Sequence, residues 1–125
     1  MQVLFLADRV PAVIENALCH ALKQEGHSVD VVKGPVAIGV ACLRFYPNMI
    51  DVVIADLGNP QAIEAVRELK QEFPIDNCIY IAITGSPRNT AYDPSLFDLE
   101  CSCYSPPVVI VEAIKKLLEA NTAAL

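Results

Sequence analysis

Two aspartates stand where runs of apolar residues end. Asp8 directly follows the run Val3–Ala7, and Asp56 lies near the end of the run Val52–Leu57. If the fold brings these carboxylates together, their repulsion requires a counter-charge. A hard divalent cation such as Mg²⁺ supplies that charge and leaves coordination positions for water and a phosphoryl oxygen. The pair therefore predicts a metal-assisted site, provided that the two runs are neighbours.

Two hydroxyl side chains close later runs of the same kind. Thr84 ends one run, where its hydroxyl could donate to an oxygen carried on Asp56, and Ser105 follows another. Purely structural roles are also open for these positions. Asp56 could cap the turn after its run, Asp8 could cap a helix, and Thr84 could be an ordinary β-branched strand residue. The functional interpretation depends on where the topology brings these residues.

Five short runs along the chain are mainly apolar instead of alternating regularly with polar residues. Such runs are typical of strands that a parallel sheet buries on both faces. The segments between them carry apolar residues largely at helical spacing, so helices are expected on both faces of the sheet. The five runs are Val3–Ala7, Val29–Val32, Val52–Leu57, Cys78–Thr84 and Cys101–Tyr104.

Three of the intervening segments have clear helical patterns. The first ends at Gly26, because glycine suits the position just after a helix. Two other segments, Pro35–Tyr46 and Asp93–Glu100, are less regular, and the second has room for only about one to two helical turns. The first of the three regular helices carries its first apolar residue at Val10. The second follows Asn59-Pro60 and ends before Pro74, and the last begins at Pro106-Pro107.

Strands and helices thus alternate along the chain, which predicts a single doubly wound α/β domain over residues 1–125. Right-handed crossovers leave few topologies for such a sheet, and the commonest for five strands is the order 2-1-3-4-5 of the flavodoxin-like, three-layer αβα arrangement. Ligands of these sheets bind beyond the carboxyl ends of the strands at the switch point, here between the first and third strands. Asp8 and Asp56 would meet there.

Composition narrows the class of protein further. Of the 125 residues, 54% are hydrophobic, and nine Lys and Arg against fifteen Asp and Glu give a net charge of −6. Without a basic stripe, nucleic-acid binding is not expected, and the apolar runs are too short to span a membrane. The amino terminus lacks the pattern of a secretory signal, so we expect a cytoplasmic protein with reduced cysteines. Cys78, Cys101 and Cys103 could form a metal or redox cluster, but buried apolar roles are expected.

Four segments together resemble the strand ends of response-regulator receiver domains. The resemblance covers essentially the whole chain, because it extends to the final amphipathic segment Glu112–Leu118, which is typical of the last helix of that family. The order and spacing of the segments carry it. They are Val3–Asp8, Asp51–Leu57, Ile81–Gly85 and Tyr104–Pro107.

The resemblance implies a role in two-component phosphorelay signalling. Asp56 would accept a phosphoryl group from a histidine kinase or a phosphotransfer protein, and Mg²⁺ would be held by Asp8, Asp56 and the backbone carbonyl of Gly58. Thr84 would be the switch hydroxyl that moves toward the phosphoryl group. This chemistry needs positioning and charge neutralisation more than covalent help. A receiver domain is not an enzyme, and since the chain stops soon after its last helix, the signal would pass to a separate protein partner.

Three positions depart from the family pattern. Ala7 stands where the family has the first of two successive acids, Ser102 where it has an aromatic switch residue, and Ser105 where it has a lysine. Serine cannot replace an ammonium group that reaches the phosphoryl oxygens, so a charge-assisted contact worth about 1.5–3 kcal/mol is missing. A weakened Mg²⁺ site is expected. Either Asp56 is phosphorylated slowly, or the domain is a phosphorylation-independent pseudo-receiver that acts as a protein-interaction module.

The resemblance also implies an output face built from the fourth helix, the fifth strand and the fifth helix. Exposed aromatic residues on this face would indicate a partner or a homodimer, whereas burial would assign them to the core. The residues concerned are Tyr92, Leu96, Phe97 and Tyr104.

Other small α/β classes fit less well at named residues. A flavodoxin needs a phosphate-binding loop where Asp8-Arg9-Val10-Pro11 stands, and a haloacid-dehalogenase phosphatase needs a second aspartate where Val10 stands. A cysteine phosphatase would place its nucleophile at the end of the first strand, where there is no cysteine. A ligand-sensing domain on the same fold stays open, because a fold does not fix a function.

Overall fold

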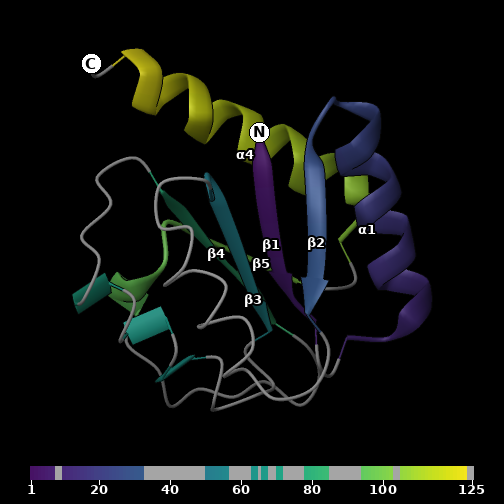
Figure 1. Cartoon of the computed structure of the whole chain (residues 1–125), viewed down its shortest axis with the longest axis horizontal. Helices are drawn as coiled ribbons and strands as arrows, with labels where there is room; N and C mark the ends of the chain where they lie inside the picture. The colour runs from purple at the N-terminus through teal and green to yellow at the C-terminus, as the bar shows by residue number, and fades with distance from the viewer. Residues whose placement is uncertain are drawn as a thin grey trace.

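The computed structural model describes residues 1–7, 10–32, 50–56, 63–64, 66–67, 70–71, 78–84, 94–102 and 105–123. Along these ranges the structure describes strands, helices and a short 3₁₀ turn (Figure 1). The elements are β1 (Gln2–Leu6), α1 (Ala12–Gln24), β2 (Ser28–Val32), β3 (Val52–Asp56), β4 (Ile79–Thr84), the 3₁₀ turn η1 (Pro94–Leu96), β5 (Leu99–Ser102) and α4 (Pro107–Ala123). The residues described between 63 and 71 are helical as well, within the segment predicted to be a helix before Pro74.

The sheet has five parallel strands in the order β2-β1-β3-β4-β5, so the predicted topology is confirmed. Figure 1 shows α1 and α4 beside each other at the sheet, and Leu18 of α1 and Ile114 of α4 pack into the same core cluster as Phe5 and Ile54. On the opposite face, Val66 of the 63–71 segment packs with β1 and β3. The molecule therefore has the expected three layers.

The central strands explain why their sequence is apolar at every position. All five residues of β3 are buried, and successive side chains enter different layers because a strand alternates its faces. Val52 and Ile54 join the core under α1 and α4, whereas Val53 and Ala55 join the core on the other face. A strand covered on both sides has no solvent face that would favour polar residues.

Helix α1 ends where glycine was expected to end it. Gly26 has φ +87°, a left-handed conformation that glycine adopts without strain from a Cβ. The backbone N–H of Gly26 donates to the carbonyl of Lys23 at 3.0 Å, and the N–H of His27 donates to Leu22 at 3.2 Å. These bonds close the last turn and direct the chain into β2.

Two aspartates extend the ladder at the amino-terminal edge of the sheet. The N–H of Gln2 donates to Oδ2 of Asp51 at 2.9 Å, and the N–H of Tyr80 donates to Oδ2 of Asp98 at 2.8 Å. In return, Asp51 and Asp98 donate their own N–H groups to the carbonyls of Gln2 and Tyr80. Each aspartate stands one residue before its strand, so its carboxylate takes the place of the next carbonyl of the ladder.

Strand β5 begins two residues earlier than the run Cys101–Tyr104 predicted. It is an edge strand, and its side chains alternate: Leu99 and Cys101 are half-buried and pack against the core, whereas Glu100 and Ser102 are exposed. The search for apolar runs therefore found this strand but not its first two residues. The segment before it contains the short turn η1, in agreement with the limited room predicted there.

The predicted crossover Pro35–Tyr46 lies outside the described residues. Among the residues that the structure describes, none of the helices combines the length and the apolarity that crossing a bilayer requires.

Candidate phosphoacceptor site

Asp56 is the last residue of β3, and its side chain is only 4% exposed. Asp56 pairs with Ile83 of β4, while the preceding Ala55 pairs with Leu6 of β1. Its backbone therefore lies at the carboxyl edge of the sheet, between the ends of the first and fourth strands, as predicted. Asp56 and Glu15 are the buried charged residues of the described part of the chain. Burial of a carboxylate is costly, so such a position indicates a specific role.

Ala7 lies beside Asp56 on the β1 side. It follows the Leu6–Ala55 pair by one residue and packs into the same core cluster as Ile54, two residues before Asp56. Because side chains two residues apart in a strand share a face, Ala7 and Asp56 face the same layer. Ala7 is 1% exposed and offers a methyl group where the family pattern has an acid. The structure thus gives Asp56 no acidic neighbour at this position.

The proposed partners Asp8 and Gly58 lie outside the described residues, so the meeting of Asp8 with Asp56 stays a prediction. Asp56 is the predicted metal ligand that lies within the described residues. Within the described ranges, no group of three or more His, Cys, Asp or Glu residues could hold a metal ion. Oxygen ligands for Mg²⁺ beyond Asp56 would have to come from elsewhere in the chain.

Thr84 and Ser105 belong to the same edge of the sheet. Thr84 is the last residue of β4, one position beyond the Ile83–Asp56 pair, and its backbone pairs with Ser102 of β5. The N–H of Ser105 donates to the carbonyl of Ser102 at 3.0 Å, which holds the half-buried Ser105 in the turn after β5. The backbone thus brings Asp56, Thr84 and Ser105 to the ends of three adjacent strands or to the turn that follows.

No lysine or arginine occurs among the described residues of the five strands or the 105–106 turn. Arg67 bonds to Glu64 within the 63–71 segment, and the ammonium group of Lys70 lies 4.8 Å from the centre of the Tyr80 ring. Within the described residues, the strands and the 105–106 turn therefore supply no positive side chain that could replace the family's lysine.

Cys78 and Cys101, the described members of the cluster that was left open, do not form a site with each other, because they lie on opposite faces of the sheet. Cys78 packs into the core on one face of the sheet, and Cys101 packs against the core on the other. Burial raises the pKa of the Cys78 thiol to about 11, and burial also raises the pKa of Cys101. Both are therefore protonated thiols at neutral pH, which agrees with the predicted apolar role. Cys103 lies outside the described residues.

The expected output face is described in part. Leu96 and Phe97 are half-buried and pack against Ile63 and Ala82, so these two residues have the core role that was one of the alternatives. Tyr92 and Tyr104 lie outside the described residues, and the predicted partner or homodimer surface stays a prediction.

No protein-family model and no curated protein matches the chain. Solved structures do match it over almost its full length. A response regulator receiver domain protein from Clostridium thermocellum superimposes with a TM-score of 0.77 at 19% identity, covering 99% of this chain and 98% of that one. A CheY-like receiver domain protein from Methanospirillum hungatei gives 0.73 at 13% identity, with 98% and 97% covered. The response regulator TrrA from Thermotoga maritima, solved with Mg²⁺ and BeF, gives 0.69 at 23% identity, with 94% and 98% covered.

These similarities show that the chain has the flavodoxin-like fold of response-regulator receiver domains. The resemblance found in the sequence motifs is thereby confirmed at the level of the fold. Identities of this size do not by themselves carry over a binding site or an activity, so the role of Asp56 must be argued from its own position.

Proposed function

We propose that this chain is a receiver module of two-component phosphorelay signalling and that Asp56 accepts the phosphoryl group. The observation that carries the proposal is the burial of Asp56 at the carboxyl end of the central strand. Ligands of doubly wound sheets bind at this edge. One buried carboxylate at the switch point, among central strands whose other buried side chains are apolar, supports a chemical role for this position.

In the proposed reaction, a carboxylate oxygen of Asp56 attacks the phosphorus atom of a phosphohistidine or a small acyl phosphate. The new O–P bond forms as the bond from phosphorus to the leaving nitrogen or oxygen breaks, and the leaving group departs with the electron pair. Phosphoryl transfer depends mainly on alignment and charge neutralisation. The Asp56 carboxylate is fixed at the end of a fully buried strand, which supplies the alignment.

The hydroxyl of Thr84 is proposed to hydrogen-bond the transferred group, since the register brings its backbone one residue beyond the partner of Asp56. Ser105 stands in the turn of the adjacent strand but lacks a positive charge. The loss of a contact worth about 1.5–3 kcal/mol corresponds to a phosphorylation slower by roughly one to two orders of magnitude than in a domain with lysine.

The residues present fit a divalent cation only weakly. Asp56 offers a hard oxygen ligand, but Ala7 replaces a second one. We propose that Asp8, Asp56 and the carbonyl of Gly58 would hold Mg²⁺, which supplies charge neutralisation when bound. A site with one acid fewer predicts a lower affinity than in domains that keep both acids.

The proposed partners follow from this role. A histidine kinase or phosphotransfer protein would donate the phosphoryl group, and a separate protein would receive the signal in the cytoplasm. The chain would act as a signalling module and not as an enzyme. A homodimer through the face near β5 would be a second route for output.

The alternative is a pseudo-receiver that works as a protein-interaction module without phosphorylation. The observation that favours it is the character of the edge around Asp56: Ala7 is apolar and buried, Ser102 is small and exposed, and Ser105 is neutral. In the family pattern a lysine stabilises the phosphoryl group and an aromatic side chain takes part in the switch. Here Ser105 and Ser102 stand at these two positions.

Labelling with acetyl phosphate distinguishes the two functions. The intact mass of the protein, incubated with Mg²⁺ and acetyl phosphate, should increase by one phosphoryl group, and Asp56→Asn should abolish the adduct. Absence of any adduct, under conditions that label an ordinary receiver domain, would refute the phosphoacceptor and leave the interaction module. An adduct that persists in Asp56→Asn would place the acceptor at another residue.

A further inference from the structure

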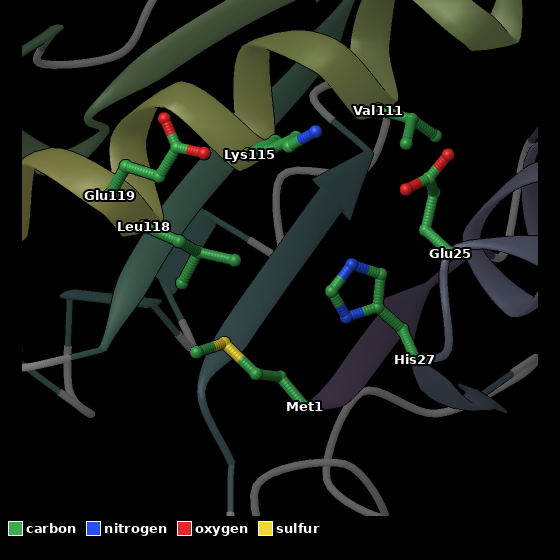
Figure 2. A pocket seen from close by; sticks show the side chains of 7 residues that line it. All are labelled: Met1, Glu25, His27, Val111, Lys115, Leu118 and Glu119. Carbon is green, nitrogen blue, oxygen red and sulfur yellow. The ribbon is translucent and has the colours of Figure 1, made fainter. Parts of the chain in front are cut away.

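A cleft opens at the edge of the sheet opposite Asp56, where the strands begin. Its volume is about 490 Å³. This is within the range of roughly 300–1,000 Å³ that is usual for small-molecule sites. The start of β1, the turn between α1 and β2, and one side of α4 form its walls (Figure 2). The cleft thus uses none of the residues assigned to phosphoryl transfer.

Both apolar and charged side chains line the cleft. Met1, Val111 and Leu118 supply the apolar part. Glu25 comes from the turn after α1, and Lys115 and Glu119 come from α4, so carboxylates and an ammonium group line the cleft together with apolar side chains (Figure 2).

None of these three charged side chains is engaged within the described part of the chain. Neither hydrogen bonds nor ion pairs there involve the side chains of Glu25, Lys115 or Glu119, although Lys115 and Glu119 are one helical turn apart. Surface charges are often unpaired. Here, however, charges of both signs line the same cleft and are available to an occupant.

His27 contributes a buried polar atom to the lining of the same cleft. Its ring lies between Met1 on one side and Glu25 and Lys115 on the other (Figure 2), and its Nδ1 atom is buried without a hydrogen-bond partner among the residues that the structure describes. Burial, assisted by the positive amino group of Met1, lowers the pKa of His27 in spite of the carboxylates of Glu25 and Asp51. A neutral imidazole has one donor and one acceptor, and buried polar atoms of this kind are normally satisfied.

The combination of groups selects a class of ligand. A simple carboxylate or a phosphate would meet two glutamates, and a simple amine would meet Lys115 and the positive amino group of Met1. Metal binding is not supported, since within the described ranges no cluster of at least three His, Cys, Asp or Glu residues has suitable geometry. A molecule that carries both charges and an apolar body matches every wall.

We infer that this cleft binds a free amino acid with an aliphatic side chain. The ligand's carboxylate pairs with Lys115, its ammonium group pairs with Glu25, and its side chain packs against the apolar lining residues Met1 and Leu118. The inference is independent of the proposed phosphorelay function, because the two sites lie at opposite edges of the sheet.

Titration of the full chain with L-leucine, followed by amide NMR shifts, tests this inference. Leucine should give saturable shifts at His27, Lys115 and Leu118 with a dissociation constant on the order of 1 mM. Two analogues test the charges: 4-methylpentanoate lacks the ammonium group and 3-methylbutylamine lacks the carboxylate. Each should bind at least roughly tenfold more weakly, a difference of about 1.4 kcal/mol.

Two variants of neighbouring exposed lysines provide the matched comparison. Lys115→Met removes the partner of the carboxylate and should weaken leucine binding at least roughly tenfold, whereas Lys116→Met, outside the cleft, should leave it unchanged. The inference is overturned if leucine gives no saturable shifts at the cleft residues. It is equally overturned if the two analogues bind as well as leucine, or if both variants lose binding to the same extent.

Discussion

Replacing Ala7 with aspartate would place a second carboxylate beside Asp56. The register and the shared face of these residues determine the size of the effect. At the roughly 5 Å that separates neighbouring strands, and with an effective dielectric constant of about 20, two carboxylates repel by about 3 kcal/mol. Since Ala7 is 1% exposed, water screens this repulsion little.

Ala7→Asn is the matched control, because asparagine has nearly the same shape without the charge. Both variants crowd a buried position and lose stability for that reason. The difference between their free energies of unfolding, measured by urea denaturation at neutral pH without divalent cations, isolates the charge and should be about 3 kcal/mol. Saturating Mg²⁺ should reduce this difference, because the cation binds the folded state of Ala7→Asp preferentially.

The stability difference without Mg²⁺ tests the position of Ala7 beside Asp56, and its change with Mg²⁺ tests the metal site. Equal stability of Ala7→Asp and Ala7→Asn without Mg²⁺ would mean that Ala7 does not face the Asp56 carboxylate, and the geometry of the site would be wrong. A difference of the expected size that Mg²⁺ leaves unchanged would keep the geometry and refute the proposed metal site.

Further variants test two residues at the amino-terminal edge of the sheet, Asp98 and His27. Asp98→Ala should lower the free energy of unfolding by about 1 kcal/mol, because Tyr80 loses the acceptor of a 2.8 Å hydrogen bond. Asp98→Asn keeps an acceptor oxygen and should lose less than half as much; equal losses in urea denaturation would contradict the role assigned to the carboxylate. The lowered pKa of His27 means that the unfolded chain, with an ordinary value near 6.5, binds a proton before the folded chain does. The contribution of His27 to stability is therefore full above that value and is lost as the pH falls through the folded pKa. His27→Gln should remove this pH-dependent loss and exposed His20→Gln should not, and an unchanged pH profile in His27→Gln would count against the burial of the imidazole.

The topology was predictable because each central strand is buried on both faces. The unbroken run around Val53 could only be a strand inside a layered sheet, and the right-handed connections then favoured the order that the structure shows. Gly26 similarly fixed the end of α1, since its positive φ is a local property of the chain. Features that depend on one residue or on one short segment were accessible to sequence reasoning.

Features that depend on a neighbouring strand were not. The predicted order placed the fifth strand at the edge, but its first two residues, Leu99 and Glu100, were not predicted, because an edge strand that is half-buried gives no continuous apolar run. Asp98 extends the ladder of β4, yet its partner Tyr80 is eighteen positions away. The cleft was missed for the same reason, because Glu25 and Lys115 come from opposite ends of the chain and look like ordinary solvated charges in the sequence.

The departures from the receiver pattern share one physical feature: they lie at the ends of strands and not in the layers. Ala7 follows β1, Ser102 ends β5, and Ser105 occupies the next turn, whereas the core positions of β1, β3 and β4 remain fully apolar. Core residues determine whether the sheet forms, because burial of apolar area drives folding. Residues at the carboxyl edge determine what the sheet binds. Substitutions at this edge can therefore change the response to a phosphoryl group while the fold persists, and Asp56 is the edge residue through which the two proposed functions differ.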